Sequence, residues 1–236
     1  MKKLLLVFSC TFSVLLTAQE TDKPYDFPVK PGTEQWAKLS SSREMDEVCV
    51  IPDQVINTLS TKALLITCLN YPRIIDFFLT NNLQSGFNIC SNRFSGLAEL
   101  LKRSDLNQVL FKSFLDIDIQ KKTMVGYDTN LSHLQIGFFE LLIAQEKIIN
   151  MFNGAEKKIL LSKATLNLEQ RKEIGESLFR QLTTAFIISR LLTSENLNPS
   201  ERDSYGNDIF SIFNSSAVLL DTTIINKLLV VSKKVN

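Results

Sequence analysis

Residues 132–152 read SHLQIGFFELLIAQEKIINMF, and this stretch decides the fold class. Ser132 and Gln135 have the spacing of a capping box, in which two side chains satisfy backbone amides at a helix start. Apolar residues then recur mainly at helical spacing and cover a wide face. They are Leu134, Phe138, Leu141, Leu142, Ile148, Ile149 and Phe152. The pattern predicts a central helix over 132–152 that ends at Asn153-Gly154, with Glu140 elsewhere on its surface.

The sequence on both sides of this stretch is also helical in pattern. Before it, capping residues and corner prolines predict short helices over 41–51, 52–59, 61–69, 72–78, 83–90, 96–102 and 105–115. Their predicted caps are Ser41, Ser60, Ser95 and Ser104. After it, we expect helices over 155–163, 168–192 and 215–234, with Glu176 and Arg180 on the polar face of the second. No run outside these predicted helices shows the clean alternation of apolar and polar residues that is typical of a strand. We therefore predict an all-α protein, an irregular array of short helices followed by longer antiparallel helices.

The N-terminal part contains a proline-rich segment. Three prolines and a glycine between residues 20 and 36 predict extended chain, because proline fixes φ and removes a hydrogen-bond donor. Two interpretations of its aromatic residues stay open: Tyr25, Phe27 and Trp36 either attach this strap to the domain or form an exposed interaction strip. The expected organisation is a signal peptide over 1–18, an extended strap over 19–40 and a single helical domain over 41–236.

The first residues have the pattern of a secretory signal peptide. Two lysines precede a mostly apolar run, and the small residue Ala18 follows at a suitable cleavage position. The run is shorter than the roughly 20 apolar residues that a membrane span needs. We therefore expect export to the periplasm, the outer surface or the medium, with no transmembrane segment in the mature chain. The alternative, a lipid on Cys10, would leave an unusually short apolar run.

Composition excludes several classes of function. The 236 residues contain 26 Lys and Arg against 25 Asp and Glu, and the basic residues are scattered, so no nucleic-acid partner is expected. Glycine-rich phosphate loops, serine elbows and histidine metal motifs do not occur in the sequence. We expect no catalytic, cofactor-binding or metal-binding site.

His133 is the only histidine, so any Ser-His-Asp or Cys-His mechanism would have to use it. In the first turn of a helix we expect an exposed surface residue, and the alternative is a pairing with Cys68 or Cys90. Asp116 and Asp118 could form an acid pair for hydrolysis, although paired acids near a helix end are usually solvated.

The expected mature chain has three cysteines, and two interpretations remain open. Cys49, Cys68 and Cys90 are either small buried hydrophobic residues, or Cys49 and Cys68 form a disulfide bridge in an oxidising compartment.

Several segments resemble one protein family. They are KPYDFPVKPGTEQW at 23–36, Met45, CVIP at 49–52, LST at 59–61, TCLNYP at 67–72 and LLKR at 100–103. The chain resembles, over residues 23–103, a family of exported, all-helical proteins of Gram-negative bacteria to which no activity is assigned. The resemblance fades afterwards, although ELLIAQ at 140–145 is similar to a helix of that family. It implies a secreted helical domain and favours the Cys49–Cys68 bridge, while Cys90 lies outside the pattern.

These observations favour a non-enzymatic, secreted or periplasmic helical protein that binds a protein, a peptide or an envelope component. The alternative is an envelope hydrolase with an unfamiliar acid pair or Cys-His arrangement. The position of His133 discriminates between the two, because a histidine beside an acid or a cysteine in a cleft favours the enzyme.

Overall fold

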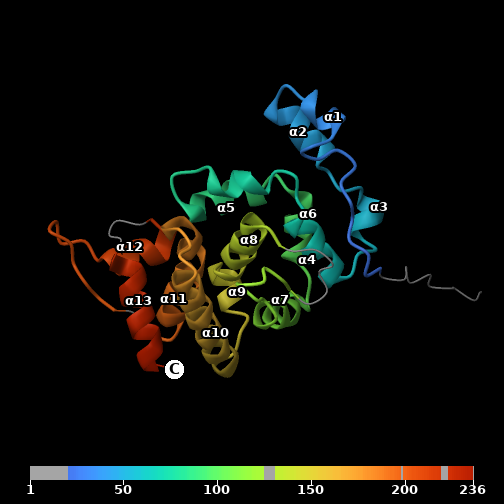
Figure 1. Ribbon diagram of the computed structural model, residues 1–236. Helices are drawn as coiled ribbons and strands as arrows, with labels where there is room; N and C mark the ends of the chain where they lie inside the picture. Colours follow the sequence, from blue (N-terminus) through green and yellow to red (C-terminus); the bar gives the residue numbers. More distant parts are fainter. Residues whose placement is uncertain (1–20, 125–130, 198, 219–222, 236) are drawn as a thin grey trace, which may run out of the picture.

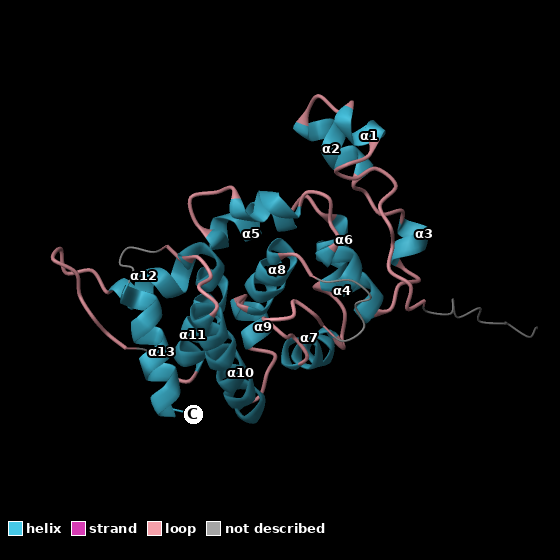
Figure 2. Cartoon of the chain, viewed as in Figure 1, coloured by secondary structure: helices cyan, strands magenta, loops and turns pink. Residues whose placement is uncertain are grey.

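The computed structural model of the chain describes residues 21–124, 131–197, 199–218 and 223–235. Within these ranges all regular secondary structure is helical, as predicted, with thirteen α-helices, one 3-10 helix and isolated β-bridges (Figures 1 and 2). No helix in the described part of the chain is long and apolar enough to cross a membrane. The predicted signal peptide and Cys10 lie outside the described residues.

The first half of the chain is an array of short helices, as the capping pattern predicts. They are α1 Glu34–Ala37, α2 Ser42–Val48, α3 Asp53–Ile56, α4 Thr61–Leu69, η1 Ile74–Phe78, α5 Leu83–Ser91, α6 Ser95–Leu100 and α7 Leu106–Leu115. Ser41 forms the predicted capping box at the start of α2, and the Ser60 hydroxyl caps α4. The other two predicted caps are wrong, because Phe94 and Asp105 occupy the capping positions of α6 and α7.

The second half contains the longer helices. They are α8 His133–Ile143, α9 Glu146–Ile149, α10 Gly154–Glu173, α11 Leu178–Ser194, α12 Ile209–Ser216 and α13 Thr223–Val235. Helices α10 and α11 form a hairpin, and α13 packs against both of them (Figure 1).

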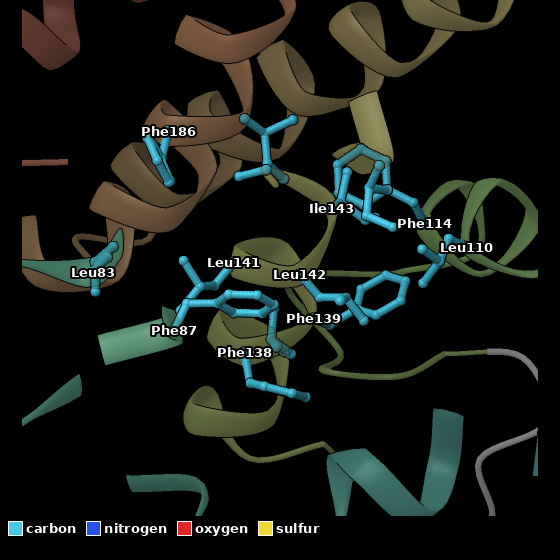
Figure 3. Close-up of a cluster of buried hydrophobic side chains, with 14 of the residues drawn as sticks. Leu83, Phe87, Leu110, Phe114, Phe138, Phe139, Leu141, Leu142, Ile143 and Phe186 are labelled. Carbon is cyan, nitrogen blue, oxygen red and sulfur yellow. The ribbon is translucent and has the colours of Figure 1, made fainter. Parts of the chain in front are cut away.

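Helix α8 lies at the centre of the molecule. Ser132 and Gln135 form the predicted capping box, and every residue of α8 from Ile136 to Ile143 is buried. Figure 3 shows its side chains projecting in different directions, towards residues of α5, α7 and α11. Phe138 meets Phe77 of η1 edge-on, with ring centroids 4.6 Å apart. Burial of each such side chain contributes about 1.5–3 kcal/mol, so α8 holds the surrounding helices together.

Several helix boundaries differ from the prediction, and at two of them apolar periodicity continues across the break. The helix expected over 132–152 stops at Ile143, and α9 begins after Gln145. The break expected between the helices over 155–163 and 168–192 also lies at a different place in the chain. Helix α10 runs without a break to Glu173, and the chain turns at Gly175, whose φ of +70° suits a residue without Cβ. Asn153 does not simply end a helix, since its side chain forms a capping box at the start of α10.

The described part of the N-terminal segment contacts the first half of the helical array. Phe27 is buried against the rings of Tyr71 and Phe94, so it is not available to an exposed strip. Tyr25 and Trp36 are half-buried against the core. The expectation of extended chain is wrong at the end of the segment, where the Thr33 side chain caps the single turn of α1.

The three described cysteines are buried free thiols, and the structure does not contain the Cys49–Cys68 bridge. Burial raises the pKa of Cys49 to about 11 and also raises the pKa of Cys68 and Cys90. In the structure all three are small residues of the hydrophobic core, and the redox state of Cys49 and Cys68 stays a prediction.

Candidate functional site

A buried charge cluster joins α8, α10 and α11. Its members are Glu140, Arg171, Glu176, Thr183 and Thr184, of which Glu140 is fully buried. Arg171 Nη2 lies 3.0 Å from Glu140 Oε2, Arg171 Nη1 contacts Glu176 Oε2, and Arg171 Nε donates to Thr184 Oγ1 at 2.9 Å. The two threonine hydroxyls donate to the Glu140 carboxylate at 2.5 and 2.7 Å. The prediction that Glu140 lies on the surface is therefore wrong.

The charges in this cluster compensate one another. Burial disfavours the charged guanidinium, but Glu140 and Glu176 outweigh burial and hold the pKa of Arg171 above its usual value. Two carboxylates around one guanidinium leave the cluster with a net negative charge. Ion pairs this deep require nearly complete hydrogen bonding to be tolerated, and the threonines supply it.

The turn at Gly175 places Glu176 in the cluster. The backbone amide of Glu176 donates to the Arg171 carbonyl at 2.8 Å, and Gln181 Nε2 donates to the Glu176 carbonyl at 2.7 Å. Because the helix is interrupted here, Glu176 faces inward and pairs with Arg171. The expectation that it lies on the polar helix face beside Arg180 is wrong.

His133 begins α8 and reaches this cluster from the side. Its Nδ1 lies 3.2 Å from Glu176 Oε1, an ion-pair distance without the alignment of a hydrogen bond. Its side chain is only 26% exposed, so the prediction of an exposed surface histidine is wrong. Burial, followed by Arg180 and Lys122, lowers the pKa of His133, and Glu176 opposes that shift. The imidazole is therefore neutral at pH 7.

His133 lines a cleft with a volume of about 320 Å³. Its apolar lining comes from Phe78, Leu134, Gly137 and Phe179, and its polar lining from His133, Arg171, Ser177, Arg180 and Thr183. The rings of Phe78 and Phe179 meet edge-on, with centroids 5.9 Å apart, and form one wall. We call this the His133 cleft.

The corner between α10 and α11, from which Phe179 and Arg180 line the His133 cleft, exposes apolar side chains and a positive charge. Ile174, Leu178 and Phe179 are each between 45% and 51% exposed at the corner between α10 and α11. Arg180 is exposed and has no ion-pair partner within the described ranges. Exposed apolar side chains beside an unpaired cation are typical of a recognition surface.

Ser177 adds a hydroxyl to the same cleft. It occupies the capping position of α11, but its side chain makes no capping hydrogen bond. The cleft lining therefore includes the residue types of a nucleophile and a base, and Glu176 lies 3.2 Å from His133 Nδ1 without the hydrogen bond that orients the histidine in a catalytic triad.

The other predicted candidates are not part of this site. No cysteine lines the cleft among the described residues, so the Cys-His pairing does not form there. Asp118 accepts a hydrogen bond from the Lys121 amide at 2.9 Å, which holds its pKa below the usual value, and Asp116 ends α7. The Asp118 carboxylate therefore stabilises a turn, and neither acid lines the His133 cleft. In the part of the chain that the structure describes, no group of His, Cys, Asp and Glu could hold a metal ion.

Comparison with known proteins gives no relative. No family model matches the chain, and neither a curated protein nor a solved structure matches it. The family resemblance of residues 23–103 stays a prediction, and function has to be argued from the His133 cleft.

Proposed function

We propose that this chain is an exported helical binding protein that receives an acidic and aromatic segment of a protein or peptide partner in the His133 cleft. The observation that carries the proposal is the combination, in one cleft, of the aromatic wall of Phe78 and Phe179 with an exposed Arg180 that has no ion-pair partner in the described ranges. Export rests on the N-terminal sequence pattern.

The lining indicates what the partner segment contains. An aromatic side chain would pack beside Phe78 and Phe179, and its burial would contribute about 1.5–3 kcal/mol. A neighbouring carboxylate would meet Arg180, with Lys122 adding positive potential near His133. Charge-assisted hydrogen bonds to arginine are directional, so this contact would set the orientation of the segment.

The buried charge cluster supports binding by keeping the cleft in one shape. Arg171 connects the floor of the cleft to α8 and α11 through side chains that are themselves hydrogen-bonded. A site fixed in advance loses little conformational entropy when a ligand arrives.

The single histidine provides a direct test. Acetyl-Asp-Phe-amide and acetyl-Lys-Phe-amide would be titrated separately while the one imidazole resonance is followed by NMR. We expect the acidic peptide to shift the resonance with at least about threefold higher affinity, and Arg180→Gln to remove that preference. The matched control is Arg93→Gln, an exposed arginine outside the cleft lining. Equal response to both peptides, or none to either, would refute the proposal.

A hydrolase is the second candidate. His133 lines a cleft and lies 3.2 Å from an acid, Glu176, the position expected of an enzyme, and Ser177 lines the same cleft. The hydroxyl would attack an ester carbonyl while the neutral imidazole accepts its proton. The C–O bond to the leaving alcohol would then break as the imidazolium returns the proton to it, and water would hydrolyse the acyl-serine. Hydrolysis of p-nitrophenyl acetate should then fall to background in both Ser177→Ala and His133→Gln. Activity that survives either change, or no activity in the unaltered chain, rejects this candidate.

A further inference from the structure

Arg190 of α11 lies in a second cavity, of about 520 Å³, bordered by α5, α9, α11 and α12. Its lining consists of Gln84, Phe87, Leu101, Gln145, Glu146, Lys147, Ile148, Arg190, Asn214 and Ser215. It shares no lining residue with the His133 cleft, so its role is independent of the function proposed above.

The guanidinium of Arg190 is buried without a full set of partners. The side chain is 10% exposed, and its Nε is buried without a hydrogen-bond partner. Nη2 lies 3.1 Å from Gln84 Oε1 and 3.5 Å from the Ser215 carbonyl. The nearest carboxylate oxygen belongs to Glu146, 3.4 Å from Nη1 on a side chain that is 76% exposed.

Other buried arginines in this chain are compensated more completely. Arg171 has Glu140 and Glu176, and Arg73 has Asp46 and Asp76 at 2.6 and 2.5 Å. Burial lowers the pKa of Arg190, and Glu146 only partly opposes the shift. Because a guanidinium stays protonated in proteins, Arg190 remains a buried cation whose hydrogen-bonding capacity is only partly used.

Neighbouring side chains hold Arg190 in place for a ligand. Gln84 accepts from Arg190 and donates through Nε2 to Gln145 Oε1 at 2.8 Å. Gln145 in turn donates to the Leu141 carbonyl at 2.7 Å, which fixes the direction of the whole chain of hydrogen bonds. The guanidinium carbon also lies 4.9 Å from the centroid of the Phe186 ring. Its orientation is therefore set before anything binds.

We propose that this cavity binds a small organic carboxylate, with the carboxylate on Arg190 and the apolar part against Phe87, Leu101 and Ile148. A guanidinium donates charge-assisted hydrogen bonds to a carboxylate, and the ligand would meet Nη1, which lies 3.4 Å from the exposed Glu146 carboxylate that it would replace. Lys147 lines the same cavity and adds a second positive charge. Glu146 competes for the guanidinium, and its exposed side chain turns away when the ligand enters.

The test is calorimetric titration of the full chain with benzoate, hexanoate and succinate, and with benzamide as a neutral match for benzoate. We expect benzoate or hexanoate to bind and benzamide not to. Arg190→Gln should weaken binding by roughly 10- to 100-fold, as expected for a lost charge-assisted pair. Glu146→Gln should tighten binding by about threefold, because it removes a competing carboxylate. A merely structural role for Arg190 would not produce that gain.

Several outcomes would overturn the inference. They are an absence of carboxylate binding, equal binding of benzamide, an unchanged affinity in Arg190→Gln, and a weaker affinity in Glu146→Gln. Circular dichroism checks that Arg190→Gln folds. If Arg190→Gln does not fold, Glu146→Gln still tests the proposal, because Glu146 is exposed and its replacement should not disturb the fold. Arg180→Gln should leave carboxylate binding here unchanged, which separates this cavity from the His133 cleft.

Discussion

Replacing Arg171 by methionine should destabilise the protein by about 3–5 kcal/mol, the usual cost of breaking a buried ion pair. The substitution removes the only guanidinium between Glu140 and Glu176 and leaves two buried carboxylates without their cation. The free energy of unfolding of an ordinary domain is about 5–15 kcal/mol, so this loss would be a large share of it. The assay is urea unfolding followed by circular dichroism at 222 nm. A loss below about 1 kcal/mol would refute the reasoning that the cluster depends on charge compensation.

Two further variants separate charge from packing. The triple change Glu140→Gln, Arg171→Met, Glu176→Gln removes every charge of the cluster and should recover most of the loss, because neutral replacements of buried ion pairs are often tolerated. Lys158→Met, an exposed position on the same helix, should change stability by less than about 0.5 kcal/mol. A triple variant that is less stable than Arg171→Met would show that lost packing, rather than lost compensation, dominates.

Three other experiments test separate parts of the structure. His133 has a pKa held below its ordinary value of 6.5, so the unfolded chain binds more protons as the pH falls through about 6.5. Stability measured by urea unfolding should decline there, and His133→Gln should remove that part of the decline. Without reductant, peptide mapping after alkylation in denaturant should find all three described cysteines modified, whereas a Cys49–Cys68 bridge would leave that pair unmodified. Gly175→Ala should cost about 1–2 kcal/mol because its φ is +70°, and Gly154→Ala, in a helix with free space around it, should be neutral or stabilising.

Local signals were sufficient for the fold class and for several helix starts. The caps at Ser41, Ser60 and Ser132 depend on side chains within a few residues, so the sequence contains the whole motif. The break at Gly175 was harder, because the apolar spacing on its two sides is compatible with one helix. Its signal was present in the glycine itself, followed two residues later by Ser177 at a capping position.

The His133 cleft could not be predicted in the same way. Glu140, Arg171 and Glu176 meet only because α10 reverses into α11 beside α8, and that packing is not local in sequence. The clue in the sequence is Glu140, a carboxylate within an apolar run. Such a residue either faces solvent, as predicted, or is buried against a cation, as it is in the structure. Arg190 similarly interrupts an apolar run, from Thr184 to Leu192, and a charge at such a position can mark a cavity.

The burial of α8 on all sides has a consequence for how this sequence can change. Its side chains pack against η1, α4 and α5 from the first half of the chain and against α11 from the second. A larger residue on any of these helices needs a smaller one elsewhere around α8, since close-packed interiors have little spare volume. Homologous sequences should therefore show correlated substitutions between α5 and α11, two segments distant along the chain that share α8 as a neighbour.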